Sequence, residues 1–123
     1  MSREALDLLG RILMRSVRDE SVNDIRQTVS GGMKGTDAEQ IRSRLAALNE
    51  SAIAALEQVV PDLVDQVIHN LLAAVEQNAQ IEIVVRGDVE VRASEASDGL
   101  AGELYGGAGW IARFSEVSRK ESN

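Results

Sequence analysis

The chain has 123 residues, a length typical of one domain, with 44% apolar residues, a single proline and a net charge of −7. This composition excludes wholesale disorder, and the acidic charge argues against a nucleic-acid partner, which needs a basic face to displace counterions from phosphates. The absence of cysteine excludes disulfides, thiolate metal sites and a thiol nucleophile.

Two further features of the sequence concern the cellular compartment in which the protein is expected. The N-terminal residues 1–4 lack the charged-then-apolar pattern of a secretory signal, and no apolar run approaches the roughly 20 residues that span a bilayer. Eleven of the thirteen basic residues are arginine, a bias that we interpret as the composition of a GC-rich, bacterial genome. We therefore expect a cytoplasmic bacterial protein with no membrane partner.

The first part of the chain has a helical pattern. Apolar residues recur every three or four positions over residues 3–20, which predicts an amphipathic helix. A second, short helix is expected to start at Ser21, because Asp24 follows it three residues later, as an acid does in a capping box. Gly31 and Gly32 then predict the end of this helix.

The most regular pattern of the chain covers residues 38–59, after a capping box that begins at Thr36. Its apolar residues are spaced alternately three and four apart, like the a and d positions of three heptads. Several of them are alanine, so a partner helix could approach closely. We interpret this stretch as one arm of an intramolecular helical hairpin, with an intermolecular seam as the alternative.

The next helix is expected over residues 61–78. Pro61 predicts a kink or a fresh helix start, because proline removes one backbone donor and disfavours helix at the residue before it. Apolar residues cover well over one face of this segment, which predicts the central and most buried helix. Asn78 is expected to end it.

Beyond residue 80 the apolar period changes to two. Residues 81–93 alternate around a turn at 86–88, which predicts a β-hairpin with one apolar and one polar face. A second hairpin is expected over residues 100–114, joined by a glycine loop at 106–109 that requires positive φ angles. The polar tail, residues 117–123, is expected to fray.

The three aromatic rings of the chain would share one face of the second hairpin: Tyr105, Trp110 and Phe114. Leucine and isoleucine occupy the other face, so both faces are apolar and the helices cover only one of them. Three interpretations stay open. Both faces are core, or they form a dimer or partner interface in which Arg113 also takes part, or they line a ligand pocket.

His69 is the only histidine, and Asp65 lies one helical turn before it. Such a pair can orient an imidazole for general-base chemistry, whereas a solvated structural pair is the alternative. No nucleophile and no further metal ligand can be placed beside it, so no catalytic residue, metal site or cofactor is predicted. A nucleic-acid role would need Arg11, Arg15 and Arg18 to cluster, which helical spacing allows.

The sequence thus predicts one α+β domain over residues 1–123, with a helical part over 3–78 and a β-meander over 80–116. Three or four helices would pack on one face of a small, mainly antiparallel sheet of about four strands. We expect a non-enzymatic bacterial interaction or regulatory module that forms a homodimer, or an acidic inhibitor or immunity-type protein with a basic partner. The alternative is a small-molecule-binding protein or enzyme with a pocket between helices and sheet around His69.

Overall fold

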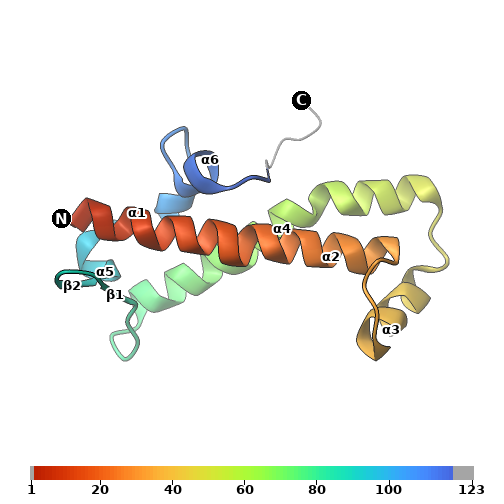
Figure 1. Cartoon of the computed structure of the whole chain (residues 1–123), viewed down its shortest axis with the longest axis horizontal. Helices are drawn as coiled ribbons and strands as arrows, with labels where there is room; N and C mark the ends of the chain where they lie inside the picture. The colour runs from red at the N-terminus through yellow and green to blue at the C-terminus, as the bar shows by residue number, and fades with distance from the viewer. Residues whose placement is uncertain (1, 118–123) are drawn as a thin grey trace.

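Two long, antiparallel helical segments dominate the computed structural model, which describes residues 2–117 (Figure 1). The first, which we call the N-terminal helix, comprises α1, η1 and α2; the second is α4. The elements in chain order are α1 (Ser2–Ile12), the π-helical segment η1 (Leu13–Asp19), α2 (Glu20–Ser30), α3 (Thr36–Leu45), α4 (Glu50–Gln77), β1 (Val84–Arg86), β2 (Glu90–Arg92), α5 (Ala93–Ala96), the 3₁₀ segment η2 (Ala101–Leu104) and α6 (Trp110–Phe114).

The N-terminal helix is continuous from Ser2 to Ser30, so the predicted new start at Ser21 is wrong. The backbone keeps right-handed helical angles at both ends of η1, and the sequence from residue 11 to 30 contains neither glycine nor proline to interrupt it. The predicted end is confirmed. Gly31 takes the left-handed conformation, with φ of 96°, and its N–H donates to the carbonyl of Gln27.

The regular stretch over residues 38–59 is not one helix. α3 ends at Leu45, and α4 begins at Glu50 after a short turn. Asn49 explains the break, because its backbone is extended and its side-chain Oδ1 accepts a hydrogen bond of 2.8 Å from the N–H of Ala52. The heptad pattern therefore does not form a continuous helical seam.

Pro61 lies inside α4, so no fresh helix starts there. Proline has no N–H, and the carbonyl of Glu57, four residues earlier, loses its usual helical donor. Arg26 of α2 replaces that donor: its Nε and Nη2 atoms lie 3.2 and 3.0 Å from the Glu57 carbonyl oxygen. The same contact ties α2 to α4. The helix ends at Gln77 with Asn78 as its C-cap, as predicted.

The first predicted β-hairpin is confirmed, although its strands are short. β1 and β2 pair antiparallel, with Val85 opposite Val91 and a loop centred on residues 87–89. The second hairpin, and with it the predicted sheet of about four strands, is wrong. Its residues form η2 and α6, so the described chain has a mixed fold of helices with one two-stranded sheet.

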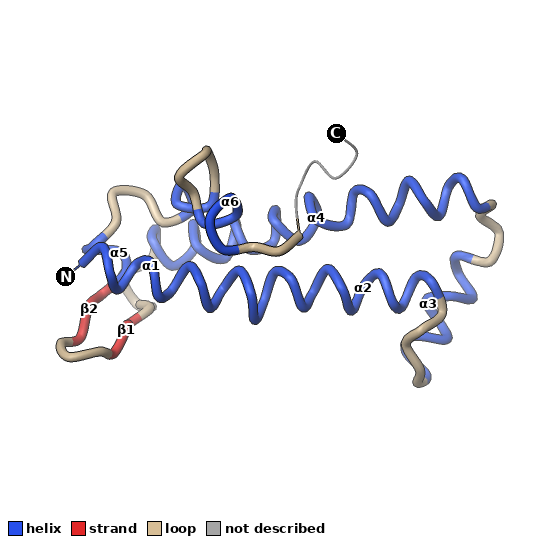
Figure 2. Tube along the Cα trace, turned by 45° about the horizontal axis from the view of Figure 1, so that its top comes forward, coloured by secondary structure: helices blue, strands red, loops and turns tan. Residues whose placement is uncertain are grey.

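The prediction that the helices pack on one face of the sheet is wrong. The sheet lies beside α1 at one end of the molecule, and the core forms where the N-terminal helix, α4 and residues 97–117 meet (Figures 1 and 2). We call residues 97–117 the C-terminal segment. The buried apolar residues are Leu6, Met14, Val22, Val60, Val64, Ile68, Leu72, Val75, Ala93, Leu100, Ala101, Leu104, Trp110 and Phe114.

Within residues 2–117, none of the helices combines the length and the apolar character needed to cross a membrane. Most of the predicted fraying tail, residues 118–123, lies outside the described part of the chain.

Candidate functional site

The four residues of the predicted aromatic surface have different environments. Trp110 is completely buried and lies against Gly10 of α1. Phe114 is also buried, and the guanidinium groups of Arg11 and Arg113 lie over its ring, at 5.2 and 4.6 Å from the ring centroid. These two rings therefore belong to the core of the single chain, which was one of the three interpretations of the sequence.

Tyr105 remains at the surface, with 38% of its area exposed. Its hydroxyl lies 3.1 Å from Nδ1 of His69, and the two rings are tilted, with centroids 5.8 Å apart. The contact joins the loop after η2 to α4. His69 thus packs against an aromatic side chain of the C-terminal segment.

Arg113 fastens α6 to α1 through a carboxylate. Its Nη1 atom donates to Asp7 at 3.0 Å, and Arg3 also approaches Asp7, at 3.4 Å. The hydrogen bond from Arg113 is the main reason why the pKa of Asp7 lies below its usual value of 3.8. Arg3 bridges further to Glu103, at 3.0 Å. Arg113 is therefore committed to an intramolecular contact.

A buried charge network lies beneath the C-terminal segment. Arg18 is fully buried and donates from Nε and Nη2 to the two carboxylate oxygens of Asp65, at 2.5 and 3.2 Å. Its Nη1 atom donates to the hydroxyl of Ser115, at 2.6 Å, and to the carbonyl of Val117. The Ser115 hydroxyl and the Glu116 amide both donate to Asp19. The network joins η1, α4 and the C-terminal segment.

This network changes the interpretation of two predicted site residues, Asp65 and His69. The alternative pocket paired Asp65 with His69, but both oxygens of Asp65 accept from Arg18, and His69 contacts Tyr105. Arg18 is also buried in this network, so it is not available for the cluster with Arg11 and Arg15 that phosphate binding would require. In residues 2–117 no group of three His, Asp or Glu side chains could hold a metal ion. Arg18 and Asp65 are buried and therefore inaccessible to a substrate. Their ion pair joins η1 to α4 and has a structural role.

The C-terminal segment covers only one side of the two long helices (Figures 1 and 2). On α4, His69 and Glu76 contact this segment, His69 at the Tyr105 hydroxyl and Glu76 at the amide of Leu100, and the buried row at Val64 and Ile68 belongs to the core. The residues one position before this buried row lie about 100° around the helix from it, on the side away from His69. They are apolar and exposed.

We call this apolar surface the bare face. On the N-terminal helix it includes Ile12, which comes one position after Arg11, whose guanidinium group lies over the Phe114 ring. Val67 is the most exposed of the set, with 69% of its area open to solvent. The members, each at least 40% exposed, are Ile12, Val17 and Ile25 on the N-terminal helix and Val59, Leu63, Val67 and Leu71 on α4.

The sequence pattern contains the bare face but does not identify it. Apolar residues around more than one face of α4 predicted the most buried helix, and that prediction is wrong for the exposed row at Leu63, Val67 and Leu71. Leu8 and Ile12 similarly widen the apolar stripe of α1. The usable signal was that each stripe is wider than one neighbouring helix can cover.

The chain was compared with protein-family models, with curated proteins and with solved structures, and no match was found in any of the three comparisons.

Proposed function

We propose that the protein is a non-enzymatic interaction module that forms a homodimer through the bare face. The observation that carries the proposal is the set of exposed leucine, isoleucine and valine side chains along both long helices. Exposed apolar side chains that recur along the length of two neighbouring helices are a surface that protein–protein contacts use. A second copy would cover two helices with two helices, in the manner of a four-helix bundle.

The polar side chains that could take part in catalysis are already engaged in contacts within the chain, which favours an interaction role over catalysis. The strongest candidate acid, Asp65, is buried against Arg18, and Asp7 and Arg113 hold α6 on α1. The members of the bare face are uncharged, so none of them would bring a carboxylate into the interface.

Light scattering after size exclusion tests the proposal at several protein concentrations. We expect the mass of two chains for the native protein, and of one folded chain for Val67→Glu, because a buried carboxylate without a partner weakens an interface strongly. Gln58→Glu is the matched control, since Gln58 is exposed on α4 outside the bare face. A native single-chain mass at all concentrations, or equal dissociation in both variants, would contradict the proposal.

A further inference from the structure

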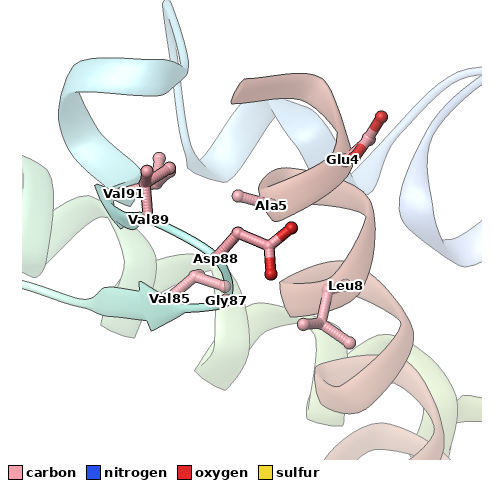
Figure 3. A pocket seen from close by; sticks show the side chains of 8 residues that line it. All are labelled: Glu4, Ala5, Leu8, Val85, Gly87, Asp88, Val89 and Val91. Carbon is pink, nitrogen blue, oxygen red and sulfur yellow. The ribbon is translucent and has the colours of Figure 1, made fainter. Parts of the chain in front are cut away.

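A second surface lies where the β-hairpin meets α1. A cavity of about 350 Å³ opens between them (Figure 3). Its walls are apolar side chains from both elements: Ala5, Leu8, Val85, Val89 and Val91. Its size falls at the lower end of the roughly 300–1,000 Å³ that is typical of binding pockets. We call it the hairpin groove.

Two carboxylates belong to this otherwise apolar groove. Asp88 extends from the hairpin loop toward α1, whereas Glu4, on the first turn of α1, lines the rim and points away from the hairpin (Figure 3). Both residues are exposed, and neither carboxylate has a hydrogen-bond or ion-pair partner within residues 2–117. The nearby Arg86 already pairs with Glu90, at 3.1 Å. The groove therefore presents unneutralised negative charge beside an apolar wall.

The hairpin wall is held in place by hydrogen bonds at its base. Glu82 accepts from the Ser94 hydroxyl at 2.7 Å and from the Ile83 amide at 3.1 Å, which joins the start of the hairpin to α5. The hydrogen bond from Ser94 is the main reason why the pKa of Glu82 is lowered. At the same base, Ala93 is fully buried and its N–H donates to the carbonyl of Ile83 at 2.9 Å. A wall fixed in this way loses little conformational entropy when a ligand binds.

We propose that the hairpin groove binds a basic segment of another protein, with an apolar side chain in the cavity and a flanking lysine or arginine at Asp88 and Glu4. Charge complementarity selects this occupant, because the overall charge of −7 adds long-range attraction to the local carboxylates. The inference does not rest on homodimer formation, since the groove lies at the hairpin and the row on α4 takes no part in it.

Nuclear magnetic resonance on the isotope-labelled full chain tests the inference with two capped tetrapeptides, Lys-Leu-Leu-Arg and Glu-Leu-Leu-Glu. We expect the basic peptide to shift the amide signals of residues 4–8 and 85–91, and the acidic peptide to leave them unchanged. Binding should weaken as salt concentration rises, because exposed charges are screened.

Variants separate the groove from general charge attraction. Asp88→Asn should weaken binding of the basic peptide by about threefold, in the range of one exposed ion pair. Asp98→Asn removes the same charge from an exposed position outside the groove and should have no effect. Ala5→Phe should abolish binding by filling the cavity, with circular dichroism as the check that the chain remains folded.

Three results would overturn the inference: no shift at millimolar peptide, equal binding of both peptides, or equal weakening by Asp88→Asn and Asp98→Asn. Concentration-dependent shifts in the groove without peptide would also overturn it, because a second copy would then occupy the groove. Repeating the titration on Val67→Glu distinguishes the two proposals. Peptide binding should persist there whether or not the native protein is a dimer.

Discussion

At the scale of single residues, Gly10 and Trp110 form a close contact between α1 and α6. A Cβ atom added at Gly10 would lie 2.4 Å from Cδ1 of Trp110, far inside van der Waals contact. Both partners are fixed, because Gly10 is within α1 and the indole is completely buried. Glycine is needed here for close approach and not for an unusual backbone angle.

We expect Gly10→Ala to lower the free energy of unfolding by about 1–3 kcal/mol, the usual cost of overpacking a core. Urea denaturation followed by Trp110 fluorescence would measure it. Gly102→Ala is the control, because an added Cβ meets nothing within 4 Å at Gly102. Equal stability of Gly10→Ala and the native chain would show that the indole does not lie against α1.

Arg18 and Asp65 form the second feature at this scale, a buried pair of opposite charge. Removing one partner leaves the other charge buried, so Arg18→Met or Asp65→Leu should each cost about 3–5 kcal/mol. The double variant should cost much less than the sum of the two, as a double-mutant cycle by urea denaturation would show. If the double variant lost as much free energy of unfolding as the two single variants together, the two side chains would not stabilise one another.

At the scale of elements, α2 and α4 are joined at the carbonyl that Pro61 leaves without a donor. Arg26→Met should cost about 1.5–3 kcal/mol, because it removes a charge-assisted hydrogen bond to the Glu57 carbonyl. In a Pro61→Ala background, the new N–H at residue 61 can bond that carbonyl, and Arg26→Met should then cost less. The same loss in both backgrounds would contradict this coupling.

The attachment of α6 to α1 should depend on pH. The pKa of Asp7 is lowered by Arg113, so its ionised form contributes stability above its unfolded value, which lies near 3.8, and this contribution is lost as pH falls through the lower folded pKa. Asp7→Asn should therefore be less stable than the native chain at pH 6. In acid denaturation scans the difference should shrink as pH falls below 3.8 and vanish once Asp7 is protonated in the folded chain. A difference independent of pH would exclude this ion pair as its cause.

Sequence reasoning succeeded where a short-range signal determines the structure. Gly31 ends the N-terminal helix and Asn78 ends α4, as their local conformational preferences predict. It failed at α6, because aromatic residues favour strands on average. The separation of four between Trp110 and Phe114, which places both on one helical face, was the better signal.

The buried network could not have been predicted from one sequence. Arg18 occupies an ordinary position in an amphipathic helix, and its partners Asp65 and Ser115 are 47 and 97 residues away. The π-helical segment η1, which contains Arg18, has no sequence signature in this chain that we recognise. Long-range pairing of this kind becomes visible only once the elements are placed in space.

At the scale of the whole molecule, the C-terminal segment lies along one side of the two long helices, and the bare face leaves apolar side chains of both helices exposed. This asymmetry leads to the central claim, that a second copy covers the bare face. The apolar pattern of α4 predicted burial, and burial by another chain would reconcile that pattern with the exposure of Leu63, Val67 and Leu71. The hairpin groove would stay available to a basic partner.

Isotope-filtered nuclear Overhauser spectroscopy on an equal mixture of labelled and unlabelled chains tests this claim most directly, because it detects only contacts between chains. The account predicts intermolecular signals from the methyl groups of Leu63, Val67 and Leu71 to methyl groups of the bare face in the other copy. Intermolecular signals confined to other surfaces, or none at millimolar concentration, would contradict it.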